Sequence, residues 1–452
     1  MDIFNSCTQL QTLDIRSPCT APDLQAAYAR LVKQNLSTLK EFRLDRGQFT
    51  DKFTSQGLCV EVTQCPELIR LELRRVALQT SPQLVEGLTR LCTSQLRSLA
   101  LADCSFPTDS QWLGHEAVFI NLTSLNVAFP SNTNAVDSFS DFASRCPNLL
   151  FLEWYAVGEE DIVSAMTHRI IPSCPRLEVV RIATEKWDTN IRFQLIEALL
   201  HPKRRVKWVD IQPSKQRTQP ELDALFARLI SSGIFETLEA VQLDQNAVSG
   251  AMAQSILCLC PRLRAFQAEK ISTDDISIDV PWVCDQLEYL KVHFFHETVH
   301  TFGCLPSQQA NVLQGFPDTD SSSTAYFHDI FCRLSKLRQL RVLDVTLYTF
   351  RSFPKISPQH GIRFQLGQGL ELLEGLKKLE WIEYLRIWPH PPSGQDVLFM
   401  INAWPNLRHF SSNYVEYSLE VRQQIAQTIK KRGPIMRPAC ATAYDHLRST
   451  YF

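Results

Sequence analysis

The sequence predicts an α/β solenoid, shaped like a horseshoe, in which short parallel strands form a concave sheet and helices cover the convex side. Three observations indicate this fold. A six-residue pattern with apolar residues at its first, fourth and sixth positions recurs along most of the 452 residues. Cysteine followed by proline precedes several copies, and stretches with helical apolar spacing lie between copies. Repeated strand–helix units of this kind stack in one dimension.

The six-residue pattern sets the positions of the strands. Its first copy is Leu10-Gln-Thr-Leu13-Asp-Ile15. The copies begin at Leu10, Leu39, Leu68, Leu96, Leu122, Leu149, Leu177, Val206, Leu238, Leu263, Leu287, Leu340, Ile382 and Leu407. Eleven of the thirteen intervals between successive copies lie between 24 and 32 residues. This regular period predicts about one strand and one helix in each interval.

The ends of the helices are marked by cysteine and proline. Cys-Pro stands just before the apolar pattern at Cys65, Cys146, Cys174 and Cys260, and Trp404-Pro takes its place before the last copy. A small thiol packs well at a buried helix end, and proline then stops the helix. Apolar residues at three- and four-residue spacing predict helices over 23–34, 189–200, 220–230, 249–259, 366–379 and 419–429.

With these repeats, the chain resembles the leucine-rich-repeat family, and within it the cysteine-containing class. That class is best known from the F-box/leucine-rich-repeat proteins, the substrate-recognition subunits of SCF ubiquitin ligases. The resemblance implies a scaffold that binds a protein partner on its concave face, with substrate recognition for ubiquitylation as the finer reading. The pattern begins by Leu10, so there is no room for an F-box before it. A Skp-type adaptor is therefore expected as a partner only if an N-terminal F-box is missing from this chain.

The domain organisation follows from the same register. We expect a solenoid of about 14 repeats over 1–430, with irregular insertions near 293–336 and 350–362, and a C-terminal tail or cap over 431–452. The insertion after Leu287 accounts for a 53-residue interval. Its segment Gly303–Thr324 contains prolines, glycines and a polar run, which predicts an exposed loop.

One catalytic pattern occurs in the sequence. His296-Glu297-Thr-Val-His300 matches the H-E-x-x-H pattern of zinc hydrolases. The further histidine expected in one class of these enzymes falls at Pro306, and the pattern follows a strand instead of opening a helix. We therefore predict loop histidines, no catalytic or metal-binding residue, no cofactor and no enzyme activity. A zinc hydrolase and a GTPase-activator-like regulatory repeat protein are the alternatives.

Charge and hydropathy favour a partner that is a protein. The net charge of −2 gives no overall attraction to nucleic acid or to an anionic membrane. The chain has no apolar run long enough to span a membrane and starts without a secretory signal. Its 14 cysteines are then expected to stay reduced. We predict a cytoplasmic or nuclear location.

Strand geometry selects the candidate binding residues. Side chains alternate between the two faces of a strand, so residues between the patterned apolar positions point away from the core. Aromatic side chains and arginines at such positions are typical anchors of protein interfaces, although aromatics also favour strands for their own sake. The predicted protein-binding residues on the concave face are Arg70, Arg74, Phe151, Glu153, Tyr155, Arg181, Trp208, Asp210, Tyr289, Lys291, Tyr384, Arg386 and Trp388.

Overall fold

The computed structural model describes the repeated core of the chain. The described residues are 7–15, 22–45, 52–76, 78, 81–104, 117–128, 136–155, 164–183, 198–199, 205–211, 219–243, 250–272, 276, 279–295, 320–345, 364–383, 393–411, 423 and 427. The chain forms two compact units, Met1–Val206 (unit 1) and Lys207–Phe452 (unit 2). No helix among the described residues combines the length and the apolar character that a membrane span requires.

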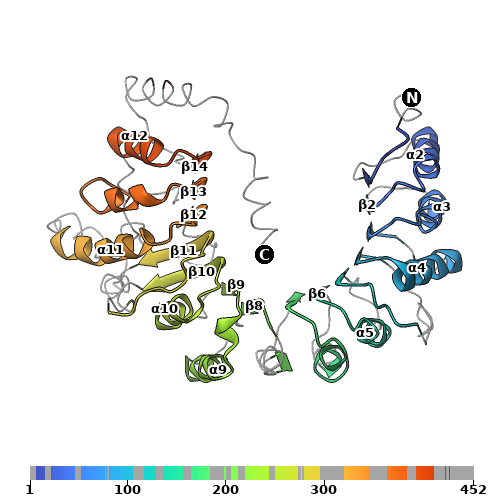
Figure 1. The fold of residues 1–452 in the computed structure, drawn as a ribbon, viewed down its shortest axis with the longest axis horizontal. Coiled ribbons are helices and arrows are strands. Elements are labelled where there is room, and N and C mark those ends of the chain that lie inside the picture. Colours follow the sequence, from blue (N-terminus) through green and yellow to red (C-terminus); the bar gives the residue numbers. More distant parts are fainter. Residues whose placement is uncertain are drawn as a thin grey trace, which may run out of the picture. The chain divides into compact units, whose positions relative to one another are not determined.

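Unit 1 is a layer of parallel strands with helices on one side (Figure 1). Its strands are β1 (Thr12–Ile15), β2 (Glu41–Asp45), β3 (Arg70–Arg74), β4 (Ser98–Ala102), β5 (Ser124–Ala128), β6 (Phe151–Tyr155) and β7 (Val179–Ala183). Each strand pairs in parallel with the next one in the chain. Its helical segments are α2 (Pro22–Gln34), α3 (Lys52–Val62), α4 (Pro82–Ser94), α5 (Val136–Ser144), the π-helical turn η2 (Met166–Ile170) and α7 (Ile171–Ser173).

Unit 2 repeats this arrangement. Its strands are β8 (Trp208–Ile211), β9 (Ala240–Leu243), β10 (Ala265–Ser272), β11 (Tyr289–Phe295), β12 (Val342–Asp344), β13 (Trp381–Glu383) and β14 (His409–Ser411), again paired in parallel in chain order. Its helices are α9 (Gln219–Ser231), α10 (Gly250–Leu259), α11 (Asp320–Leu334) and α12 (Gly394–Ala403), with the 3-10 turns η3 (Ile234–Glu236) and η8 (Leu370–Gly375).

The patterned apolar residues build the core between strands and helices. In β3, Leu71 and Leu73 are buried and their neighbours Arg70 and Arg74 are exposed. The pairing carries this alternation across unit 1, because Leu73 pairs with Leu44 on one side and with Leu101 on the other. Apolar side chains therefore stack on one side of the sheet over successive repeats, as the pattern predicted.

The cysteines before the strands close the ends of the helices. Cys65, Cys146, Cys174 and Cys260 are buried, which confirms the expected thiol packing. The Cys174 thiol donates to the carbonyl of Ala143 in the preceding repeat, with 3.4 Å between sulfur and oxygen. Burial raises the pKa of the Cys65 thiol to about 11, so the thiols are neutral at physiological pH.

Among the predicted helices, 23–34, 220–230 and 249–259 are confirmed by α2, α9 and α10. The prediction of a helix over 366–379 was wrong, because only the 3-10 turn η8 forms there. Two glycines explain this, since Gly367 and Gly369 take left-handed φ values of 79° and 113° that end a regular helix. Nearly all of 189–200 and 419–429 lies outside the described residues.

The region of the long interval also differs from its prediction. Of the loop expected over Gly303–Thr324, residues 320–324 instead open the helix α11, and 303–319 lie outside the described residues. Serine, threonine and aspartate favour the first turn of a helix as well as loops, which explains the error. Residues 350–362 and 431–452 lie outside the described part, so the domain boundaries stay predictions.

One strand lies in a different register from the predicted one. Val342 pairs with Trp381, and Leu343 pairs with Ile382. Leu379 is therefore the first residue of that copy, and the predicted start at Ile382 was three residues too late. Leu379 is buried, and its N–H bonds to the carbonyl of Leu376.

Candidate protein-binding face

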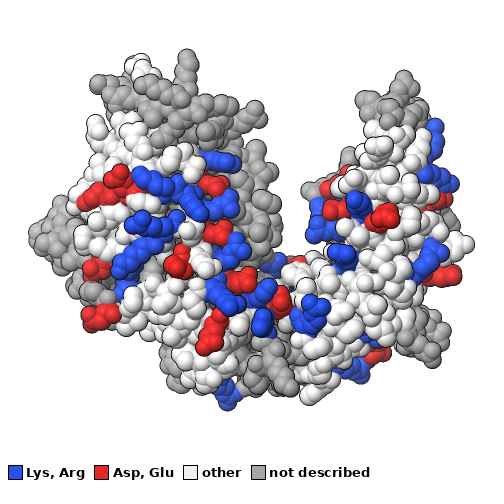
Figure 2. Space-filling view, viewed as in Figure 1, with Lys and Arg blue, Asp and Glu red and all other residues white. Residues whose placement is uncertain are grey.

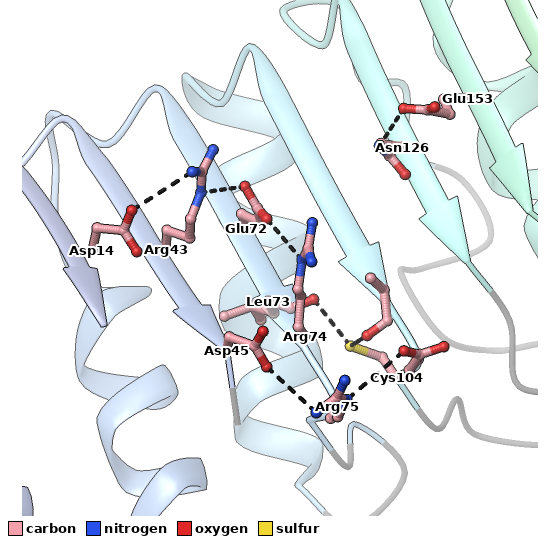
Figure 3. Close-up of polar contacts among 12 residues, drawn as sticks. Asp14, Arg43, Asp45, Glu72, Leu73, Arg74, Arg75, Cys104, Asn126 and Glu153 are labelled. Atoms are coloured by element: carbon pink, nitrogen blue, oxygen red, sulfur yellow. Dashed lines mark hydrogen bonds and ion pairs between the residues drawn. The ribbon is translucent and has the colours of Figure 1, made fainter. Parts of the chain in front are cut away.

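The outward side of the strands in unit 1 carries a network of paired charges. The Arg43 guanidinium lies between two carboxylates, 3.6 Å from Asp14 and in contact with Glu72. The Arg74 Nε lies 3.0 Å from a carboxylate oxygen of Glu72. Figure 3 shows these side chains, which come from β1, β2 and β3. We name Asp14, Arg43, Glu72 and Arg74 the face network.

Exposure sets the roles of the members of this network. The Glu72 side chain is 15% exposed and is held from two sides, whereas that of Arg74 is 52% exposed. Arg70 is the outward residue of β3 before Glu72; its side chain is 55% exposed and lies 4.0 Å from Glu41. The carboxylates therefore orient guanidinium groups whose outer edges remain open to solvent. A guanidinium held this way can donate paired hydrogen bonds to an incoming carboxylate or carbonyl.

Small side chains follow on the next two strands. The outward positions of β4 and β5 carry Ser98, Ala100, Ala102, Ser124 and Ala128, all of them half-buried, together with Asn126. The Asn126 side chain donates to Glu153 on β6 at 2.5 Å, and Arg181 on β7 donates to the other oxygen of Glu153 at 2.9 Å. The face of unit 1 thus has a strip of small side chains on β4 and β5, here named the low strip, between two charged clusters.

Two residues at the ends of the strands take an unusual backbone conformation. Arg75 and Asp103 follow β3 and β4 with φ of 58° and 53°. Each still bonds to the next strand, because the Arg75 N–H donates to the Ala102 carbonyl at 2.8 Å and the Asp103 N–H to that of Ala128 at 2.9 Å. Arg75 also lies 3.9 Å from Asp103 and 4.0 Å from Asp45; Figure 3 shows Arg75 next to Asp45. A charged residue therefore directly follows each of the strands β3 and β4.

Several outward positions of unit 2 are buried, although Gln242, Gln267 and Glu383 are half-buried. Trp208, Tyr289 and Lys291 are 3%, 0% and 6% exposed, so the expectation that they face solvent was wrong. Lys291 pairs with Asp344 at 3.1 Å, and both side chains are almost completely shielded. Alternation of side chains tells which side of a strand a residue occupies but not whether that side is open to water. A role for these residues in binding stays a prediction.

The other predicted site residues divide into three groups. Arg70, Arg74, Phe151 and Arg181 are exposed or half-buried on the face of unit 1, and Glu153 is buried beside Arg181. Tyr155 and Asp210 belong to β6 and β8, but their side chains lie outside the described part. Tyr384, Arg386 and Trp388 lie outside the described residues altogether.

Two sets of outward residues were missed from the sequence. Asp14 is an outward residue of the first strand, which the six-residue pattern covers, and it was not among the predicted residues. Trp381 and Glu383 were missed because of the register error in β13, where Trp381 Nε1 donates to Glu383 at 3.4 Å. Stacking the copies on their first leucine would have found Asp14, whereas Trp381 and Glu383 depend on a register that the sequence leaves open.

The described residues hold no group of three or more His, Cys, Asp or Glu side chains that could bind a metal ion. The H-E-x-x-H pattern at His296, Glu297 and His300 lies outside them. The zinc hydrolase alternative is therefore neither supported nor tested by the described geometry.

No protein-family model and no curated protein matches the chain. It is similar in structure to TLR13 in complex with ssRNA13 (16% identity, TM-score 0.40), with 84% of this chain and 53% of that chain covered. The chain thus spans about half the length of TLR13. It is also similar to the leucine-rich-repeat protein LegL7 from Legionella pneumophila, at 9% identity and TM-score 0.34, over 93% and 97% of the two chains. The tropomodulin C-terminal domain of Caenorhabditis elegans matches 39% of this chain and 90% of its own, at 15% identity and TM-score 0.22.

The fold predicted from the sequence is confirmed in each unit. The strands pair in parallel in chain order, one per repeat, and helical segments connect most of them in the described part of the chain. The described apolar residues of the six-residue pattern are buried between the two layers, except for Leu10 and Leu13 of the first copy, which are half-buried. Both units therefore have the leucine-rich-repeat fold.

Proposed function

We propose that this chain is a non-enzymatic scaffold that binds a protein partner through the strand face of unit 1. The observation that carries this proposal is the face network, in which Asp14 and the half-buried Glu72 hold Arg43 and the exposed Arg74 in place. Arginine is enriched among the residues that contribute most to protein interfaces. Because these side chains are already ordered by their ion pairs, binding costs less conformational entropy than it would for free arginines.

The low strip of β4 and β5 supports the same proposal. Small outward residues between two charged clusters leave space for side chains of a partner. The clusters carry both signs, with Arg70 and Arg74 on one flank and Glu153 with Arg181 on the other. A partner surface with complementary charges of both signs would be oriented by these flanks.

The finer proposal is substrate recognition for ubiquitylation in the cytoplasm or nucleus. It is supported by the buried cysteine that precedes the strands in both units, at Cys65, Cys146, Cys174 and Cys260. This feature is the one that the chain shares with the cysteine-containing class of F-box/leucine-rich-repeat proteins. Co-purification of a Skp-type adaptor with the full-length gene product would support this role, and its absence under conditions that retain other partners would contradict it.

The test of the binding face combines crosslinking with charge reversal. A photo-crosslinking amino acid at position 70 should capture a protein partner in cells, because the Arg70 side chain points to solvent from the strand face. The double variant Arg70→Glu, Arg74→Glu should lose that partner by at least about tenfold in a quantitative pulldown. Both residues are more than half exposed, so the fold should persist and can be checked by circular dichroism.

A matched control comes from the helix side of the same unit. Arg30 on α2 is exposed, and its Nε bonds only weakly to the Ala26 carbonyl at 3.4 Å. Arg30→Glu changes the net charge in the same direction and should keep the partner. Equal loss with both variants, or no loss with either, would show that the face of unit 1 is not the binding surface.

A further inference from the structure

A line of alternating charges runs along the edge of unit 2 where the strands begin. The residue directly before each strand is, in chain order, Lys207, Glu239, Arg264, Glu288, Arg341, Glu380 and Arg408. We name these residues the rim ladder. Each member after Lys207 donates its backbone N–H to the carbonyl of the previous member, at 2.7 to 2.8 Å. The backbone therefore holds neighbouring members at the spacing of adjacent strands, about 4.8 Å.

The carboxylates of the rim ladder are neutralised within it. Arg264 Nε lies 2.9 Å from a Glu288 oxygen, and Arg341 lies 3.7 Å from Glu288 and 2.8 Å from Glu380. Glu288 and Glu380 are 18% and 22% exposed, whereas Arg264 and Arg341 are 43% and 36% exposed. The cations thus present more of their surface to solvent than the anions that they pair with.

Further cations surround the ladder in the turns that lead into the strands. Arg262, Lys336, Arg338, Lys377 and Lys378 are all exposed there. Glu236, Asp285 and Glu374 are exposed acidic residues next to the ladder in the described turns of this unit, and Glu374 lies 3.7 Å from Lys377. Figure 2 shows Lys and Arg side chains gathered on this side of the unit, with Asp and Glu between them. The rim of unit 2 therefore carries more positive than negative charge.

We propose that this rim binds an extended acidic peptide segment of a protein partner, with carboxylates at every third residue. Like charges in the ladder are two strands apart, at about 9.6 Å. A peptide in the polyproline II conformation has three residues per turn and rises about 3.1 Å per residue, so every third side chain returns to the same side after about 9.3 Å. Such carboxylates would meet Arg264, Arg341 and Arg408 in turn, and the residues between them would lie over Glu288 and Glu380.

A nucleic acid fits this surface less well than a peptide does. Its backbone carries a negative charge at every nucleotide, so phosphates would also fall on the ladder glutamates. Proteins that bind single strands add aromatic side chains on which bases stack. No aromatic residue occupies a described position of the rim ladder. The two positions before the first apolar residue of each copy in unit 2 also carry no aromatic residue. The alternating charges of the ladder therefore favour a peptide whose carboxylates are separated by the same distance as the ladder arginines.

The test measures binding of labelled peptides to the full chain by fluorescence anisotropy at low salt. The first probe is a peptide of repeated Glu-Pro-Ser units, and the second has the same composition with its glutamates in one block. The proposal expects the first to bind at least about threefold more tightly than the second. The double variant Arg262→Glu, Arg338→Glu should weaken the first peptide by about tenfold or more.

The control uses the corresponding edge of unit 1. Lys40 and Arg97 are exposed, and they directly precede β2 and β4. The double variant Lys40→Glu, Arg97→Glu changes the net charge by the same amount and should leave the affinity for the first peptide within about twofold. Failure of the first peptide to bind, equal loss in both double variants, or equal affinity for the two peptides would overturn the proposal. Tighter binding of a single-stranded oligothymidylate of equal charge would overturn it in favour of nucleic acid. This surface differs from the strand face of unit 1, so either proposal can fail without the other.

Discussion

Units 1 and 2 share one repeat architecture but distribute their charges differently. In unit 1, ion pairs lie on the strand face, and amide side chains secure the edge where strands begin: Gln95, Asn121 and Asn148 each donate to a backbone carbonyl of the preceding repeat at 2.8 Å. In unit 2, several outward positions of the strands are buried, and the edge where the strands begin carries the rim ladder. The repeat pattern therefore fixes the core, while the positions around it are free to carry different surfaces.

The first prediction concerns a feature that the two units share. Burial raises the pKa of the Cys92 thiol in unit 1 and of the Cys284 thiol in unit 2 to about 12, from the ordinary value of 9.0. The folded state then keeps its protons while the unfolded state loses them. Stability from each thiol is full below about pH 9 and is lost as the pH rises toward 12, by up to about 1.4 kcal/mol per pH unit.

Urea unfolding between about pH 8 and pH 10.5 measures this loss. Each variant removes one such thiol, so Cys92→Ala and Cys284→Ala should each reduce the number of protons released on unfolding by up to one. The free energy of unfolding should therefore depend less steeply on pH in each variant. Because both units are built on buried cysteines, the two variants should behave alike. A pH dependence that neither variant changes would show that these thiols do not titrate on unfolding.

The second prediction has the largest expected effect and concerns the residue at the end of the helix before a strand. Trp404 occupies in unit 2 the position that Cys146 occupies in unit 1, and its Nε1 donates to the Leu373 carbonyl at 2.9 Å. Trp404→Ala should lower the free energy of unfolding by about 3–5 kcal/mol, because it leaves a large cavity. Cys146→Ala removes one sulfur atom and should cost about 1 kcal/mol. Similar losses in denaturant unfolding would mean that the tryptophan site collapses around the smaller side chain.

The strands and the core could be predicted from the sequence because burial of Leu71 and Leu73 repeats at a fixed period. The register of β13 could not, since Leu376, Leu379, Ile382 and Leu385 follow one another at three-residue intervals and several alignments satisfy the pattern. The backbone turn before Leu379 decides among them.

The binding face was only partly predictable, for a different reason. Alternation places Arg74 and Tyr289 on the same side of their strands, yet one is exposed and the other is buried. Whether a face is open depends on contacts far apart in the sequence. The rim ladder, by contrast, is readable from the sequence: aligning the copies of unit 2 on their first leucine puts Lys207, Glu239 and Arg264 in one column.

The third prediction compares an ion pair on each strand face. The side chains of Lys291 and Asp344 in unit 2 are 7% and 0% exposed, whereas Arg74 and Glu72 in unit 1 are 52% and 15% exposed. Removing one partner of a buried pair costs about 3 kcal/mol, so Asp344→Asn should destabilise unit 2 by that amount. Arg74→Gln should cost less than about 1 kcal/mol, because water screens the exposed partner. Equal costs in urea unfolding would contradict the difference in burial.

The smallest effect separates the two kinds of edge by their response to salt. Arg341→Met removes the cation between Glu288 and Glu380 and should cost about 1 kcal/mol at low ionic strength. Asn148→Ala removes the amide that donates to the Ile120 carbonyl and should cost a similar amount. Molar salt screens the charges, so the cost of Arg341→Met should fall to about half while that of Asn148→Ala stays constant. Denaturant unfolding in urea, which adds no ions, measures both. If the two costs change together with salt, the rim ladder contributes to stability through packing of the arginine stem and not through its charge.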